Sequence, residues 1–367
     1  MMNSDNVKIL SVVGARPQFI KVATISRSLQ NESGVKEVLV HTGQHYDDNM
    51  SHVFFDELEI LEPQYNLGIG SATHGVQTGR MLKAVEKVLI KEKPNWVLVY
   101  GDTNSTLAGA LAAVKLRIPT AHVEAGLRSF NRDMPEEINR VLTDHASDVL
   151  FAPTAVAVDN LLKEGIPEKR IHFVGDVMYD AALIYGKNAE YKSKILEHLN
   201  IKSKNYILAT IHRAENTDNL LRLKAIFKGL MEVSKEISVV IPIHPRTKKA
   251  LESIRLLSKV ENILKIIPPV GYLDMIMLEK HSRLITTDSG GVQKEAFFYK
   301  VPCVTLRDET EWVELVELDW NYIQPPENAL AIARKIQQIL IPLKRNETSL
   351  YGAGNTACKI VEILLKE

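Results

Sequence analysis

Short, nearly continuous apolar runs recur along the whole chain and alternate with stretches of helical periodicity. The runs are rich in β-branched residues, as expected of strands that are buried on both faces of a parallel sheet. They lie at 8–13, 36–40, 96–100, 120–123, 149–152, 171–174, 206–211, 239–243, 263–267, 284–287 and 301–306. The helical stretches between them include 79–93, 103–117, 136–147 and 220–237. This alternation predicts an α/β protein with doubly wound parallel sheets.

The predicted strands form two groups of about six, which indicates two Rossmann-like domains in this chain of 367 residues. A polar break at 202–205 precedes the first strong strand of the second group. We place the N-terminal domain at 1–176 and the C-terminal domain at 177–351. A final helical segment, 352–367, can pack on either domain.

Composition and charge exclude several classes of protein. Lys and Arg number 45, as do Asp and Glu, so the chain lacks the positive excess of a typical nucleic-acid binder. Two cysteines, Cys303 and Cys358, form neither a disulfide framework nor a CxxC metal site. No run reaches the roughly 20 apolar residues of a membrane span, and no signal-peptide pattern opens the chain. We therefore expect a soluble cytoplasmic protein without nucleic-acid or membrane partners.

Charged and special residues gather where the predicted strands end. These turns lie at 14–18, 41–46, 101–104, 124–128, 212–213, 244–246, 288–291 and 307–308. Ligands of open parallel sheets bind outside the carboxyl ends of the strands. Two such sheets facing each other would form a cleft lined by these turns. A single polar turn is explained equally well as an ordinary loop, but eight of this composition favour a ligand site.

The turn at 288–295, with the sequence DSGGVQKE, is the strongest candidate for phosphate binding. Ser289 can cap the following helix, while Gly290 and Gly291 let a ligand approach the N–H groups of the helix terminus. Glu295 can accept hydrogen bonds from ribose hydroxyls. The pattern is neither GxxxxGK[ST] nor GxGxxG, so neither ATPase nor NAD chemistry is indicated. An ordinary capped turn remains the alternative.

Further cations and three carboxylates complete the candidate site. Arg16 and Lys21 suit a diphosphate, although a solvated charge pair explains them as well, and His212 next to Arg213 ends a strongly apolar strand. The carboxylates are Asp102, Glu124 and Glu136. Two acids at the ends of adjacent buried strands raise one another's pKa and supply an acid and a base near neutral pH. The structural alternatives are a helix cap, a paired buried acid and a residue that complements a helix dipole. His74, His122 and His145 lack the spacing of a zinc site.

Seven motifs, in their order and spacing, resemble the non-hydrolysing UDP-N-acetylglucosamine 2-epimerases. They are VGARPQFIK (13–21), TGQHY (42–46), YGDT (100–103), HVEAGLR (122–128), PEEINR (135–140), HRAEN (212–216) and TDSGGVQKE (287–295). The resemblance implies a glycosyltransferase-B-like fold, homodimerisation and no cofactor. It also implies that UDP is eliminated across C1–C2 to give a 2-acetamidoglucal and then adds back to the other face, which inverts C2.

The resemblance assigns roles to individual residues. Catalysis would involve Asp102, Glu124, Glu136 and His212. Nucleotide binding would involve Arg16, Lys21, Arg213, Ser289, Gly290, Gly291 and Glu295, to which we add Tyr272 and Arg307 as expected binding residues. Some members bind a second UDP-sugar as an activator, and the matching positions are Gln44, Arg213 and His244, with His45 beside them.

Two departures concern the sugar. The link at 128–135 is short, and Trp312-Val313 stands where many members have Arg-Pro. Both features resemble the branch that epimerises UDP-2,3-diacetamido-2,3-dideoxyglucuronate, and Arg132 in the link is placed to contact the carboxylate of a uronate. UDP-N-acetylglucosamine remains the expected substrate. The alternatives are this uronate, a hydrolysing 2-epimerase, a glycosyltransferase and a UDP-sugar sensor without activity.

Overall fold

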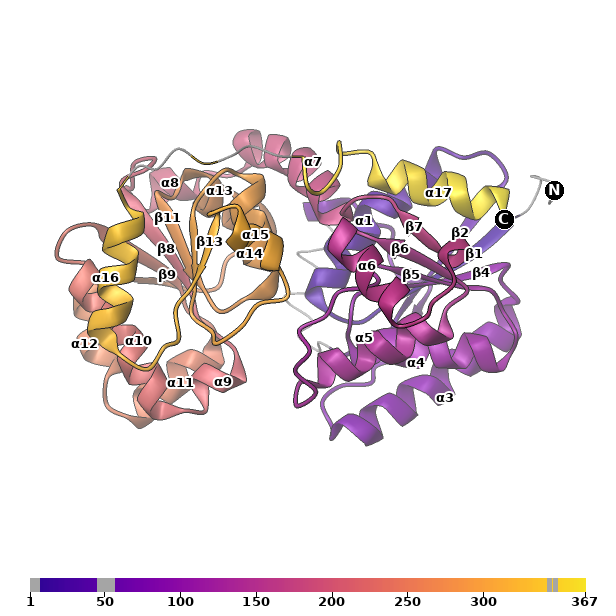
Figure 1. Ribbon diagram of the computed structural model, residues 1–367, viewed down its shortest axis with the longest axis horizontal. Coiled ribbons are helices and arrows are strands. Elements are labelled where there is room, and N and C mark those ends of the chain that lie inside the picture. Colours follow the sequence, from indigo (N-terminus) through magenta and orange to yellow (C-terminus); the bar gives the residue numbers. More distant parts are fainter. Residues whose placement is uncertain (1–6, 45–56, 342–344, 346–348) are drawn as a thin grey trace. The chain divides into compact units, whose positions relative to one another are not determined.

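The computed structural model describes residues 7–44, 57–341, 345 and 349–367. The chain forms two compact units, Met1–Ile184 with Ser349–Glu367, and Tyr185–Thr348 (Figure 1). The division falls inside helix α7 (Val177–Lys192), a few residues beyond the boundary that we placed at 176/177. The C-terminal segment, for which either domain was open, belongs to the first unit.

The first unit is built on a parallel sheet with the strand order β3-β2-β1-β4-β5-β6-β7. Its strands are β1 (Val7–Val13), β2 (Val35–His41), β3 (Tyr65–Asn66), β4 (Trp96–Tyr100), β5 (Thr120–Val123), β6 (Val149–Ala152) and β7 (Ile171–Phe173). Its helices are α1 (Arg16–Gln30), α3 (His74–Glu92), α4 (Asn104–Lys115), α5 (Pro135–Ala146), α6 (Ala155–Lys163), the 3₁₀ turn η1 (Glu168–Arg170), the start of α7 and α17 (Thr356–Lys366).

The second unit has a parallel sheet with the order β10-β9-β8-β11-β12-β13. Its strands are β8 (Tyr206–Thr210), β9 (Ser238–Pro242), β10 (Lys265–Ile267), β11 (Leu284–Thr287), β12 (Cys303–Thr305) and β13 (Asn321–Ile323). Besides the rest of α7, its helices are α8 (Ile195–His198), α9 (Ala214–Thr217), α10 (Leu220–Val233), α11 (Pro245–Ser253), α12 (Leu257–Ile263), α13 (Tyr272–His281), α14 (Gly290–Phe298), α15 (Val313–Glu317) and α16 (Ala329–Ile339). Two doubly wound units confirm the predicted α/β fold.

Both sheets are buried on their two faces, as the continuous apolar runs predicted. In β8, Ile207 and Ala209 pack in one core cluster with residues of α10 and α16. Tyr206 and Leu208 on the other face pack with Val292 of α14. Full burial of one such side chain contributes about 1.5–3 kcal/mol, so this two-sided packing is a major stabilising term of the fold.

The strand order reverses beside β1 in the first unit and beside β8 in the second. In the first unit, β1 and β4 are neighbours, and the chain continues from them toward opposite edges of the sheet. In the second unit, the same holds for β8 and β11. Such switch points are where doubly wound folds bind ligands. Gly109 brings α4 close to the first of them, because a Cβ at this position would lie 3.0 Å from Val99 and 3.2 Å from Val12.

The end of the described chain is fastened to the first unit. Helix α17 packs against α1 (Figure 1). The Ala357 N–H donates to the Asp180 carboxylate at 2.8 Å, and the Asp176 N–H donates to the Tyr351 carbonyl at 3.0 Å. Among the helices in the described ranges, none combines the length and apolar character that crossing a membrane requires.

Candidate active site

The turn after β1 is tied to the end of β4 by one buried side chain, Gln18. Its Oε1 accepts from the N–H groups of Gly14 at 2.8 Å and Ala15 at 3.0 Å. Its Nε2 donates to the Tyr100 carbonyl at 2.8 Å. The turn that carries Arg16 is therefore held against the turn that begins at Gly101. Sequence reasoning assigned no role to Gln18, although it lies inside the first motif.

Glu124 forms a buried ion pair with Lys21. The Lys21 Nζ contacts Glu124 Oε1, and the two side chains are 8% and 9% exposed. Glu124 has a φ of 73°, in the left-handed region that a residue other than glycine rarely adopts, and such strained residues cluster at functional sites. A costly conformation at the end of β5 thus holds the carboxylate beside its cation. The expected contact of Lys21 with UDP stays a prediction.

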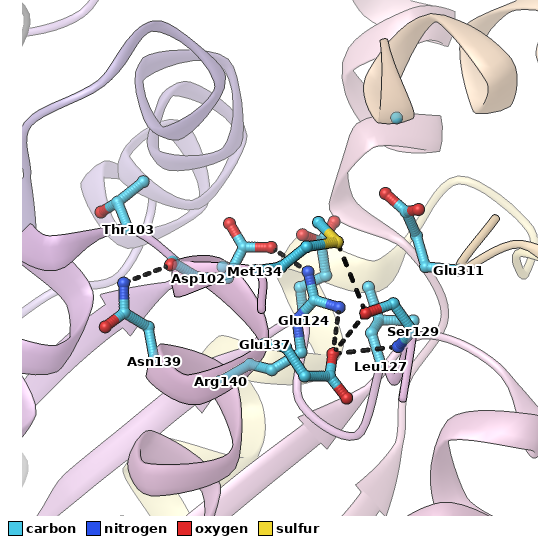
Figure 2. Close-up of polar contacts among 12 residues, drawn as sticks. Asp102, Thr103, Glu124, Leu127, Ser129, Met134, Glu137, Asn139, Arg140 and Glu311 are labelled. Atoms are coloured by element: carbon cyan, nitrogen blue, oxygen red, sulfur yellow. Dashed lines mark hydrogen bonds and ion pairs between the residues drawn. The ribbon is translucent and has the colours of Figure 1, made fainter. Parts of the chain in front are cut away.

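Asp102 is not the cap of the helix that follows it, so the helix-cap alternative does not hold for this residue. The N-cap of α4 is Thr103, whose side chain accepts from the Thr106 N–H. The Asp102 carboxylate instead pairs with the Arg140 guanidinium, and its side chain is 33% exposed. The carboxylates at the ends of β4 and β5 therefore pair with different cations, and Figure 2 shows the contact of Asp102 with Arg140.

The two glutamates that open α5 differ in burial. Glu136, the expected third acid, is half-buried. Glu137 is buried and accepts from the N–H groups of Ser129 at 2.9 Å and Phe130 at 3.0 Å. It also pairs with Arg140 Nη1 at 2.8 Å (Figure 2). Glu137 thus fixes both the short link and the cation that holds Asp102, a role that the sequence did not reveal.

In the second unit, Asp288 organises the turn that carries His212 and Arg213. It is fully buried and accepts from the N–H groups of both residues at 3.1 Å and from Asn216 Nδ2 at 3.0 Å. The His212 ring is partly exposed, with its Nδ1 3.6 Å from Asp288 Oδ1. A buried carboxylate beside one ring nitrogen helps to orient the imidazole, whose centroid lies 6.0 Å from that of the His244 ring.

The N-terminus of α14 is shaped by close contact with Glu311. A Cβ on Gly290 would lie 2.4 Å from Glu311 Oε1, so only glycine fits without a shift. Glu311 Oε2 pairs with Arg307 Nη1 at 2.8 Å, and its Oε1 lies 3.9 Å from Arg213 Nη2. Ser289 precedes the helix, but its side chain makes no capping hydrogen bond, which corrects the predicted cap. Because the N-terminus of a helix favours an anion, this turn remains the candidate phosphate site.

The remaining expected ligand residues of this unit differ in burial. Tyr272, at the start of α13, is buried, and burial together with the charge of Glu295 raises the pKa of its hydroxyl well above the ordinary value. Glu295 itself is buried in α14. Gly291 has open space at its Cβ position.

Two residues expected at a regulatory site form hydrogen bonds at the N-termini of helices. Gln44 Oε1 accepts from the Ser105 N–H at 3.1 Å and from its hydroxyl at 2.7 Å, at the start of α4. His244 caps α11, because its Nδ1 accepts from the Arg246 N–H at 3.2 Å. His45 lies outside the described residues. Their regulatory role stays a prediction.

Comparison with known proteins agrees with this geometry. Residues 27–365 match the family described as UDP-N-acetylglucosamine 2-epimerase. A Methanococcus maripaludis protein named UDP-N-acetylglucosamine 2-epimerase homolog is 56% identical over 98% of this chain and 99% of its own. The UDP-2,3-diacetamido-2,3-dideoxy-D-glucuronate 2-epimerase of Pseudomonas aeruginosa is 50% identical over 98% of this chain and 100% of its own. The crystal structure of Methanocaldococcus jannaschii UDP-GlcNAc 2-epimerase in complex with UDP-GlcNAc and UDP is 49% identical, with a TM-score of 0.90 over 98% of this chain and 99% of that one.

Proposed function

Because the chain belongs to the UDP-N-acetylglucosamine 2-epimerase family, as its motifs predicted, and is thus an isomerase, we propose that it inverts C2 of a UDP-2-acetamido sugar. UDP-N-acetylglucosamine is the substrate that we expect. One observation carries the proposal: two carboxylates follow the neighbouring strands β4 and β5, beside the switch point of the first sheet, and each pairs with a different cation.

The proposed reaction begins at C1 of the sugar. The C2 hydrogen has no adjacent carbonyl, so its removal becomes feasible when the C1–O bond breaks and positive charge develops at C1. UDP departs with the bonding electron pair, and a base takes the C2 proton, which leaves a 2-acetamidoglucal. UDP then adds back to C1 while an acid delivers a proton to the other face of C2. No net oxidation takes place.

The departing UDP is stabilised, in this proposal, by the second unit. The N-terminal turn of α14, with Ser289 and the two glycines, offers N–H groups to the diphosphate. Arg213 and the His212 ring, oriented by Asp288, add donors beside it. Glu295 and Tyr272 would contact the nucleoside, and Arg307 supports the site through Glu311.

The proton transfers at C2 are assigned to the first unit. Asp102 and Glu124 serve as the acid and the base, with Glu136 as the third carboxylate near the sugar. Arg16 would contact the phosphates. Positioned acids and bases contribute about 10²–10⁴-fold to the rate, so loss of either carboxylate must be severe. A sensor without activity would not need these carboxylates.

The test is to incubate the protein with UDP-N-acetylglucosamine in D2O and to follow C2 by NMR. We expect deuterium at C2 of both epimers, with the UDP–sugar bond intact at equilibrium. Stoichiometric release of UDP and free sugar would instead identify a hydrolysing enzyme. Complete retention of the original C2 hydrogen would count against elimination, unless a single shielded base returns the same proton.

The diacetamido-uronate remains the second candidate substrate. Relatives at 50% identity include enzymes named for each sugar, so similarity alone does not separate them. Arg132 is exposed in the link that Glu137 holds in place. A charge-assisted contact with the uronate carboxylate would contribute roughly 1.5–3 kcal/mol. Wild type and Arg132→Ala should be compared on both UDP-sugars. Selective loss of uronate turnover in the variant would favour the uronate, and no change would reject it at this residue.

Homodimerisation and a cytoplasmic location also remain predictions. Sedimentation of the purified protein at several concentrations tests the first of them.

A further inference from the structure

His122 occupies an unusual place for a histidine. It lies in β5, fully buried, two residues before Glu124. Its Nε2 lies 2.7 Å from the carbonyl oxygen of Gly101, and its Nδ1 lies 2.7 Å from Oδ1 of Asp144 in α5. The histidine therefore connects the turn that carries Asp102 with the helix behind the sheet.

Both partners of the ring are acceptors. A carbonyl oxygen cannot donate, so Nε2 must carry a proton. Asp144 Oδ2 accepts from Arg128 Nη1 at 2.7 Å and from the Gly126 N–H at 3.1 Å, as expected of an ionised carboxylate. Burial opposes ionisation, but the hydrogen bonds and charges of His122 and Arg128 hold the pKa of Asp144 below its ordinary value. Nδ1 must then donate as well, and a histidine that donates from both nitrogens is an imidazolium.

The charges around the ring balance. Arg128 extends its Nε and Nη2 to the two oxygens of Glu164, each at 2.7 Å, at the end of α6. His145 of α5 lies 3.2 Å from the same carboxylate. Two buried cations thus face two carboxylates in one connected chain, which removes the large cost of burying an isolated charge.

We propose that His122 is a positioning residue of the acid–base edge, held as an imidazolium by Asp144. It fixes the Gly101 carbonyl and hence the peptide that joins Gly101 to Asp102. A neutral ring can exchange tautomers and present a lone pair to the carbonyl, whereas an imidazolium can only donate. The hydrogen bond to the Gly101 carbonyl therefore has a fixed direction.

A small displacement of Gly101 would disturb both carboxylates. Gly101 has a φ of 65°, and a Cβ on it would lie 3.0 Å from Lys21 Nζ and 3.5 Å from Glu124 Oε1. The turn thus runs directly beside the Lys21–Glu124 pair and continues into Asp102. The claim that the position of Gly101 affects turnover rests on the proposed function. The claim that the His122 ring is protonated does not.

The protonation state is tested with protein labelled with ¹⁵N at histidine. At neutral pH, NMR should show protons on both ring nitrogens of His122. In Asp144→Asn, the new amide can donate to Nδ1 and still accept from Arg128. We expect Nδ1 to lose its proton in this variant while Nε2 keeps its own. An unprotonated ring nitrogen in the wild type would overturn the proposal.

The positioning role is tested by kinetics. His122→Phe keeps a ring but removes both donors, and we expect kcat to fall about 10- to 100-fold, with KM and UDP affinity within about 2-fold of wild type. The paired variant His122→Gln/Asp144→Asn restores a donor to Gly101 and leaves no unpaired charge. It should recover kcat to within about 3-fold, as should Asp144→Asn alone near neutral pH.

Two kinetic outcomes would refute the positioning role. One is a folded His122→Phe variant with wild-type kcat. The other is a folded Asp144→Asn variant whose kcat drops as far as that of His122→Phe, because its donor to Gly101 survives. If the wild type does not epimerise any UDP-sugar, the proposed function fails, and the NMR experiment still decides whether His122 is an imidazolium.

Discussion

Replacing Glu124 by glutamine separates catalysis from stability at one position. From sequence alone, Glu124→Gln is near-isosteric and should leave folding intact. The structure gives a different expectation, because Lys21 is buried against this carboxylate. We expect the variant to lose at least about 100-fold in kcat and, in addition, to destabilise the first unit.

The size of the destabilisation follows from the burial of the pair. The side chains of Lys21 and Glu124 are 8% and 9% exposed, so solvent compensates little of the charge that remains. Removal of one member of a buried ion pair costs about 3–5 kcal/mol. For a unit of this size, 1 kcal/mol corresponds to about 2–4 °C in the thermal midpoint. The midpoint of Glu124→Gln should therefore fall by about 6–20 °C.

The matched control is Lys21→Met/Glu124→Gln, which removes both charges. Replacing a whole buried pair with uncharged side chains is often nearly neutral, so we expect stability within about 1 kcal/mol of wild type. The kcat of the double variant should stay low. Calorimetry and the C2 exchange assay measure the two quantities. An unchanged midpoint in Glu124→Gln would refute the buried pair, and full turnover by the double variant would leave Glu124 with a structural role alone.

Three further outcomes are expected. Asp102→Asn should lose at least about 100-fold in kcat but less than about 1 kcal/mol in stability, since Asp102 is one-third exposed; a large drop in midpoint would show a structural role. Gly290→Ala should weaken UDP binding at least about 10-fold in calorimetry, because the methyl group meets Glu311; unchanged affinity would place UDP elsewhere. Burial alone would raise the pKa of Asp144, but its contacts with His122 and Arg128 outweigh burial and lower the pKa from 3.8. The ionised carboxylate therefore stabilises the fold at neutral pH, and this stabilisation is lost as the pH falls below that value. Asp144→Asn should accordingly flatten the acid side of the midpoint profile, and a profile like that of wild type would contradict the ionised state.

The sequence predicted the strands well where they are long and apolar, and less well at the sheet edges. Tyr65–Asn66 and Asn321–Ile323 form the short edge strands β3 and β13, and neither has an apolar run that periodicity can detect. Their pairing depends on the neighbouring strand. The division inside α7 lies a few residues beyond the predicted boundary, because a helix that continues across a boundary leaves no break in its pattern.

The candidate site was predictable as a set of turns but not as a set of pairs. Asp102 and Glu124 were predicted as site residues because they follow buried strands. The sequence does not show which cation pairs with each of them. Glu136 and Glu137 are adjacent in one motif, and only the direction of α5 decides which one is buried. His122 was noted only as unsuited to zinc, since its partners Gly101 and Asp144 are 21 and 22 residues away.

The return of α17 to the first unit makes the second unit an insertion within the first. Residues up to Ile184 and from Ser349 onward share one compact body, and 185–348 lie between them in the chain. During synthesis, α17 is therefore made only after the whole second unit, and α1 cannot pack against it before then. The buried residues Ile360, Val361 and Leu364 of α17 complete this packing. All strands of the second unit are made before α17. The first unit, although its strands are made first, is thus the last of the two to receive all of its helices.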